Sequence, residues 1–195
     1  ASQLLSKIRD VFPKNFSEES NLLNIEALLN CFRVKDGGEA REGTRELFQR
    51  AQRVCRDEYR KLVLASNLFV FDHFIGKSSE GSSNTENSLE DLLYLLETST
   101  IGFRYLYVLG YYNIMRYYEA VGDATNAQTY LLRIGSIDDS DSLLWRCAMG
   151  LSDPVGTEVE FLVSTPYMLA FLPNYQISPP SFDRRVDKIS EIISR

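Results

Sequence analysis

The stretch from Tyr105 to Trp145 constrains the fold of this chain most strongly, because it predicts three helices joined by two tight turns. Its first part repeats apolar or aromatic residues at three- and four-residue steps, as on one face of a helix: Tyr107, Tyr111, Ile114 and Tyr118. Gly122-Asp123 predicts a helix end and a new start, since glycine accepts a left-handed C-terminal cap and aspartate caps the next helix. Asp138-Asp139-Ser140 predicts the second turn and cap. Two helices this close cannot cover all of their apolar surface, so neighbouring segments are expected to pack on them.

The same stretch resembles a tetratricopeptide-type helical hairpin, a motif that repeats about every 34 residues. Tyr111 matches the aromatic that opens the motif, and Ile114 and Tyr118 match the next positions on the first helix. Gly122-Asp123 matches the turn, Ala127 the small residue at the helix crossing, and Leu131 the large apolar residue that follows. Trp145 stands where a second repeat would begin. Met115, Ile134 and Asp139 depart from the motif, where a small residue, Ala and Pro are usual. The resemblance covers roughly residues 105–150 and implies hairpins that hold a partner segment in a concave groove. An ordinary hairpin in an irregular all-α domain is the alternative.

Outside that stretch, hydrophobic periodicity and capping residues predict further helices, for a total of about eight or nine. They are expected over 2–12, 17–34, 39–75, from Ser88 to about Thr98, 142–150, 157–172 with an interruption at Thr165-Pro166, and from Ser181 onward. The run from Asn67 to Phe74 is apolar almost all round, which fits a strand or a helix buried on several sides. Helix is favoured because the pattern continues unbroken. Residues 77–87, KSSEGSSNTEN, predict a flexible internal loop.

The whole chain, residues 1–195, is expected to form a single all-α domain. We predict an array of antiparallel helical hairpins that is α-solenoid-like and irregular at both ends. A content of 44% hydrophobic and 25% charged residues is typical of a soluble globular protein. The first residue is Ala, which suggests a piece of a longer chain.

The net charge and the cysteine content indicate which partners and which cellular compartment are expected. The net charge of -6 repels phosphate backbones on average, so nucleic-acid binding is disfavoured. Cys31, Cys55 and Cys147 are widely spaced within apolar stretches, as expected of free thiols in a reducing compartment. An intracellular location, cytoplasmic or nuclear, is therefore predicted. No segment contains about 18 uninterrupted apolar residues, so no membrane span is expected.

The sequence contains no recognisable catalytic pattern. His73 is the single histidine, and Asp72 beside it would lie on a different face of a helix, so a structural histidine is expected. One histidine and three dispersed cysteines do not predict a metal site, and helix capping explains the acidic residues from Asp138 to Asp141. Phosphate-binding glycine loops and the usual hydrolase motifs are absent from the sequence. We therefore predict a non-enzymatic protein with no catalytic residue and no cofactor.

Six tyrosines spread around one predicted helix, so they cannot all be buried: Tyr105, Tyr107, Tyr111, Tyr112, Tyr117 and Tyr118. One interpretation puts Tyr107, Tyr111 and Tyr118 in the core and the others on its rim. The other interpretation has Tyr105, Tyr112 and Arg116 line a groove for a partner peptide or helix, since Tyr and Arg are enriched in binding hot spots.

The predicted function is protein–protein interaction, as a scaffold or adaptor subunit of a larger assembly. Two alternatives stay open. One is a helical nucleic-acid-associated module that uses the basic residues between Arg41 and Lys61, and the other is an enzyme with an unfamiliar site near His73. The sequence names neither the partner nor the oligomeric state, which includes a possible homo-oligomer.

Overall fold

The computed structural model describes residues 16–31, 38–75, 84–100, 102–152, 157 and 168–169 of the chain. These residues contain seven α-helices, one short π-helix and no strand, which confirms the all-α prediction. The elements are α2 (Phe16–Cys31), α3 (Gly38–Val54), α4 (Glu58–Val70), the π-helix η1 (Phe71–Ile75), α5 (Asn84–Thr98), α6 (Arg104–Val121), α7 (Ala124–Gly135) and α8 (Leu143–Ala148).

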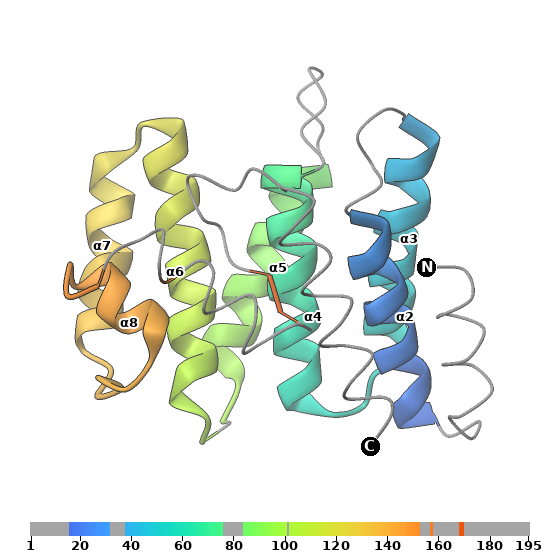
Figure 1. Ribbon diagram of the computed structural model, residues 1–195, viewed down its shortest axis with the longest axis horizontal. Coiled ribbons are helices and arrows are strands. Elements are labelled where there is room, and N and C mark those ends of the chain that lie inside the picture. The colour runs from blue at the N-terminus through green and yellow to red at the C-terminus, as the bar shows by residue number, and fades with distance from the viewer. Residues whose placement is uncertain are drawn as a thin grey trace.

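The helices from α2 to α7 stand side by side and alternate in direction, with α8 beside α6 and α7 at one end of the row (Figure 1). Each helix packs against the next one along the chain. In addition, α4 packs against α6, and α6 packs against α8. The row therefore has two layers. One contains α3, α5 and α7, and the other, which we call the even layer, contains α2, α4, α6 and α8.

The hairpin of α6 and α7 forms as the sequence predicts. Gly122 ends α6 in the left-handed conformation, with φ of 81°, which glycine adopts without the strain that a Cβ would bring. Asp123 then caps α7, because its carboxylate accepts the backbone N–H of Asn126 at 3.0 Å. The cap predicted at Asp138-Asp139-Ser140 is wrong in detail, since Ser142 is the residue that caps α8. The backbone N–H of Trp145 donates to its hydroxyl.

The single helix predicted over 39–75 is wrong. The chain leaves α3 at Val54 and enters α4 at Glu58, so the two helices fold back on each other and pack together. The new start is fixed by Asp57, whose carboxylate accepts the backbone N–H of Arg60 at 2.8 Å. The helical interpretation of 67–74 is confirmed: α4 continues directly into η1, and every residue from Leu62 to His73 is buried.

Other predicted boundaries shift or fall outside the described residues. Helix α5 begins at Asn84, so Ser88 lies within it instead of capping it. Ser88 is buried, and its side chain bonds the Asp72 carboxylate of η1. The loop predicted over 77–87 is wrong at residues 84–87, which belong to α5. The helix predicted to extend to 172 is wrong at residues 168–169, which are neither helix nor strand. The helix predicted over 2–12, residues 77–83, and most of the chain after 152 lie outside the described residues.

Helix α6 is the centre of the described fold. It packs against α4, α5, α7 and α8, so most of its circumference is covered. Its buried residues are Leu106, Val108, Leu109, Gly110, Tyr112, Asn113, Ile114 and Met115. A helix enclosed in this way has no single apolar face. The burial of each tyrosine on α6 therefore depends on which neighbouring helix covers it.

Candidate functional site

The structure separates the three residues predicted to line a groove. Tyr105 is half-buried at the start of α6, where its hydroxyl forms a hydrogen bond with the Tyr59 hydroxyl of α4. The exposed ring of Phe103 lies edge-on to Tyr59, with 5.3 Å between the ring centroids. Tyr105 therefore belongs to an aromatic cluster at the start of α4 and the start of α6. Tyr112 and Arg116 lie further along α6 and come together in a pocket.

The interpretation that places Tyr112 on the rim of the core is wrong, because its side chain is only 2% exposed. Tyr107, Tyr111 and Tyr118 are half-buried and pack against the edge of the core instead. The three- and four-residue steps place those tyrosines on one face of α6 correctly. However, Tyr112 lies on the adjacent face of α6, which α8 covers. The sequence pattern of α6 alone does not reveal that α8 packs there.

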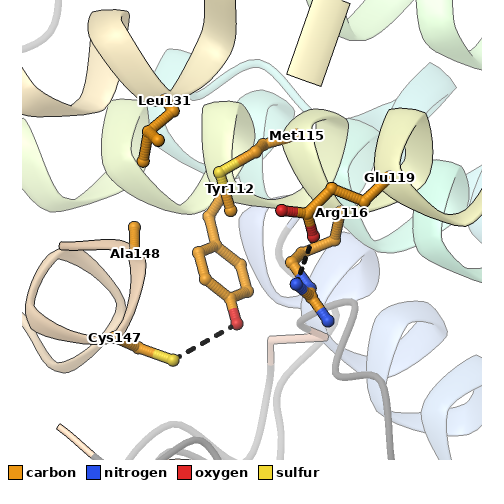
Figure 2. A pocket seen from close by; sticks show the side chains of 7 residues that line it. All are labelled: Tyr112, Met115, Arg116, Glu119, Leu131, Cys147 and Ala148. Carbon is orange, nitrogen blue, oxygen red and sulfur yellow. Dashed lines mark hydrogen bonds and ion pairs between the residues drawn. The ribbon is translucent and has the colours of Figure 1, made fainter. Parts of the chain in front are cut away.

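A pocket of about 120 Å³ lies between α6, α7 and α8 (Figure 2). Its lining combines polar and apolar side chains: Tyr112, Met115, Arg116, Glu119, Leu131, Cys147 and Ala148. The Tyr112 ring extends from α6 toward α8, and its hydroxyl oxygen lies 3.6 Å from the Cys147 sulfur. Burial raises the pKa of the Tyr112 hydroxyl well above its ordinary value, and the neighbouring thiol adds to the rise. The phenol is therefore neutral at physiological pH and serves as a hydrogen-bonding group.

Arg116 supplies the positive charge of the pocket. Its Nη1 forms an ion pair with the Glu119 carboxylate one helical turn further along α6. Its Nε is buried and has no hydrogen-bond partner among the residues that the structure describes. A buried guanidinium N–H without an acceptor is unfavourable by about 1–3 kcal/mol, so a carbonyl or carboxylate oxygen that reached Nε would be bound favourably.

The size of the pocket limits the kind of occupant. A volume of about 120 Å³ is well below the range of about 300–1,000 Å³ that is usual for pockets of small-molecule ligands and cofactors. A single side chain of a polypeptide is a better match to this space. The apolar part of the lining, formed by Met115, Leu131 and Ala148, suits its aliphatic portion.

A second polar site is formed by Asn67 of α4 and by Asn113 of α6, the residue that follows Tyr112. The backbone N–H of Leu169 donates to Oδ1 of Asn67 at 2.7 Å, and the Leu169 carbonyl accepts from Nδ2 of Asn113 at 3.1 Å. The two amides thus hold both polar groups of one backbone residue. We call Asn67 and Asn113 the asparagine clamp.

The asparagine clamp is oriented by two more polar side chains of the even layer. Nδ2 of Asn67 donates to Asn24 of α2 at 2.9 Å, which leaves Oδ1 of Asn67 as the acceptor for Leu169. Nδ2 of Asn113 also donates to the Ser66 hydroxyl of α4 at 2.8 Å. All four side chains are buried. A network of this kind fixes the direction of each amide before the backbone is bound.

The asparagine clamp and the pocket lie on neighbouring parts of the even layer. Asn113 and Arg116 are three positions apart on α6, and residues with this spacing are neighbours on a helix surface. Met168 and Leu169, the short orange-red stretch between α4 and α6 in Figure 1, are 0% and 1% exposed and are neither helix nor strand. The even layer thus already holds one non-helical piece of polypeptide.

Asn67 and Asn113 were not predicted as site residues, although the sequence contains a signal for them. Asn67 and Asn113 each stand within apolar or aromatic helical runs, LVLASNLFVF and YVLGYYNIM. A polar amide at the centre of such a run is buried, and a buried amide needs hydrogen-bond partners. The partner itself, the Leu169 backbone, lies 102 positions from Asn67 and has no local sequence signature.

The surroundings of His73 are those of a packed core residue. Its ring lies between Phe69 and Tyr117, with centroid distances of 4.5 and 4.3 Å. The neighbouring Asp72 is bound by Arg45 of α3, whose Nε donates at 3.0 Å. Burial raises the pKa of the Asp72 carboxyl above its ordinary value, although Arg45 acts in the opposite direction. The ion pair between Arg45 and Asp72 connects α3 to η1. Neither His73 nor Asp72 lines the pocket between α6, α7 and α8.

The basic residues between Arg41 and Lys61 are divided between two helices. Arg45, Arg50 and Arg53 belong to α3, whereas Arg60 and Lys61 belong to α4. They therefore do not form the continuous stripe that one long helix would present. Within the described residues, no cluster of three or more His, Cys, Asp and Glu side chains could hold a metal ion. In the same part of the chain, no helix is long and apolar enough to cross a membrane.

No protein-family model matches this chain, no curated protein is significantly similar to it in sequence, and no solved structure is significantly similar to its fold. The tetratricopeptide resemblance therefore stays a prediction that rests on the residues of the α6–α7 hairpin. The function is therefore inferred from the arrangement of side chains on the even layer.

Proposed function

We propose that this chain is a protein-interaction module and that its even layer binds a segment of a partner protein. One partner side chain enters the pocket between α6 and α8, and an oxygen of the partner accepts a hydrogen bond from Arg116. The observation that carries the proposal is the buried Nε of Arg116, which has no acceptor among the described residues. The pocket lining also includes Tyr112, so two of the three residues predicted from the sequence meet there.

The size and chemistry of the pocket support a polypeptide ligand over a metabolite. Its volume suits one side chain, and its lining pairs a guanidinium group with aliphatic carbons. Arginine and tyrosine are the residue types that contribute most often to binding hot spots. A scaffold or adaptor role in a larger assembly is in keeping with this kind of recognition, because the pocket lining offers binding groups for a partner segment.

The experiment compares proteins captured from the native cell by the tagged full-length chain and by three variants. Arg116→Ala removes the guanidinium group, and Arg116→Lys keeps the charge but lacks the Nε–H. Arg146→Ala is the matched control, because Arg146 is exposed on α8 and does not line the pocket. Each captured protein is then purified and titrated against the four chains.

We expect both Arg116 variants to weaken binding about tenfold or more, in line with the loss of a charge-assisted hydrogen bond. Arg146→Ala should bind like the wild type. Equal affinity of all four chains for every captured protein, with unchanged circular dichroism, would remove the pocket from the binding surface.

A further inference from the structure

The asparagine clamp makes both of its hydrogen bonds to Leu169 with the backbone of that residue and not with its side chain. Asn67 accepts from the N–H of Leu169, and Asn113 donates to its C=O. Within a helix these two groups are used by the helix itself, so only a non-helical residue can offer both to another element. Any non-helical segment that fits the space could form the same two hydrogen bonds.

The side chains beside this backbone supply the selectivity of the site. Met168 and Leu169 are both buried completely or nearly so, although they are neighbours in a non-helical stretch. The even layer therefore encloses two consecutive large apolar side chains as well as the backbone between them. Backbone hydrogen bonds combined with side-chain pockets are the general means by which proteins bind non-helical peptides.

From this arrangement we propose that Met168–Leu169 is an internal occupant of a peptide-binding site, and that a partner segment of the same chemistry replaces it. The partner segment is non-helical and presents two consecutive large apolar residues to the asparagine clamp. This inference rests on the proposed function, because it identifies the partner as a polypeptide bound on the even layer. Its consequence is regulation, since the chain blocks its own site until a partner displaces residues 168–169.

Competition with a tethered occupant makes the expected affinity low. A segment joined covalently to its own site competes with a free peptide at a high effective concentration. A free peptide therefore binds the wild-type chain weakly, and it binds more tightly once the internal occupant has been weakened. The direction of this change separates an exchangeable occupant from a permanent part of the core.

The probe is a fluorescent synthetic peptide with the sequence of residues 163–174, VSTPYMLAFLPN. Fluorescence anisotropy measures its binding to the full-length wild type and to the full-length variant Leu169→Ser, in which the internal occupant is weakened. A second peptide carries an N-methyl group on the leucine nitrogen that corresponds to Leu169 and so cannot donate to Asn67. A second variant combines Leu169→Ser with Asn113→Ala to remove half of the asparagine clamp.

We expect the peptide to bind Leu169→Ser at least tenfold more tightly than it binds the wild type. N-methylation of the peptide, or the added Asn113→Ala change, should reduce that binding at least tenfold. Failure of the peptide to bind a folded Leu169→Ser chain would overturn the proposal. A wild-type dimer that disappears in Leu169→Ser would also overturn it, because the exchanged segment would then come from a second copy and not from a partner protein.

Hydrogen exchange of the wild-type chain gives an answer even if Leu169→Ser fails to fold. An exchangeable occupant requires the Leu169 amide to exchange by local opening, at least tenfold faster than the core amide of Ile114. Equal exchange rates for the two amides would show that residues 168–169 leave only when the whole chain unfolds, and would overturn the proposal. Neither experiment depends on Arg116. A negative result for exchange of residues 168–169 therefore does not affect the Arg116 binding test, and a negative Arg116 test does not affect the exchange result.

Discussion

The backbone N–H of Leu169 donates to Oδ1 of Asn67 at 2.7 Å across 102 positions of the sequence. This hydrogen bond lies in the interior, where the Asn67 side chain is buried between Asn24 of α2 and Leu169. It connects the part of the chain after α8 to the first helices of the row. The even layer is therefore stabilised by a polar network in addition to its apolar contacts.

Asn67→Ala is expected to destabilise the fold by about 1–3 kcal/mol, because it removes the acceptor of a buried N–H and the donor to Asn24. Asn21→Ala is the matched control, since Asn21 is exposed on α2, and it should change the free energy of unfolding by less than about 0.5 kcal/mol. Urea denaturation followed by circular dichroism measures both. Equal stability of the two variants would contradict a structural contribution from the Asn67 network.

Tyr112→Ala is expected to lower the free energy of unfolding by about 3–5 kcal/mol, because it empties a large buried side-chain volume at the centre of the fold. A Tyr112 side chain that lined an open groove would instead leave the melting temperature nearly unchanged. Tyr94→Ala serves as the comparison, since Tyr94 on α5 is 66% exposed and should have little effect. Thermal melts of the two variants test this expectation. A melting temperature of Tyr112→Ala close to that of the wild type would contradict a central packing role for the Tyr112 ring.

The contrast between Tyr111 and Tyr112 shows what local periodicity supplied and what it could not. The all-α class, the α6–α7 turn at Gly122-Asp123 and the helical state of 67–74 were predictable, because each depends on local propensity, capping and spacing. Periodicity also grouped Tyr111 with the other tyrosines on one face. It could not show that α8 covers Tyr112, because that contact depends on a helix 35 positions away.

The reversal between α3 and α4 was missed for a related reason. No glycine or proline marks it, and the cap residue Asp57 stands within a run of charged residues, RDEYRK, that reads equally well as a helix surface. The candidate site was predictable only in part. Arg116 and Tyr112 were named from residue type, whereas the asparagine clamp depends on Leu169, a partner far away in the sequence.

Asp72 and Asp123 should respond to pH in opposite directions. Burial raises the folded-state pKa of Asp72 above 3.8, so its contribution to stability is fully present below pH 3.8 and is lost as pH rises through the raised value. Hydrogen bonds from Asn126 lower the folded-state pKa of Asp123 below 3.8, so its contribution is present above pH 3.8 and is lost as pH falls through the lowered value.

Urea denaturation of the wild type, Asp72→Asn and Asp123→Asn between about pH 3 and pH 7 tests this opposition. The stability of the wild type minus that of Asp72→Asn should decrease as pH rises. The stability of the wild type minus that of Asp123→Asn should increase over the acidic end of the same range. Asparagine preserves the helix cap at position 123, so the second difference reports charge alone. Two differences that change in the same direction would contradict the assigned environments.

Gly110 of α6 permits the close approach of α5, and Gly110→Ala should therefore destabilise the fold. A Cβ at this position would lie 2.7 Å from Cδ2 of Leu96, and Leu96 is itself buried. Overpacking of this kind costs about 1–3 kcal/mol, which outweighs the gain of about 0.5–1 kcal/mol in helix propensity. Gly43→Ala in α3 gains the same propensity with no atom within 4 Å of the added Cβ, so it should stabilise the chain.

The double variant Gly110→Ala/Leu96→Ala separates the contact from other effects of the glycine. Once the Leu96 side chain is shortened, the added methyl group of Gly110→Ala has space, so the two changes should together cost less than the sum of their separate costs. Urea denaturation of the four chains gives this coupling energy. Simple additivity would show that the loss in Gly110→Ala does not come from Leu96, and that the spacing of α5 and α6 is set by other residues.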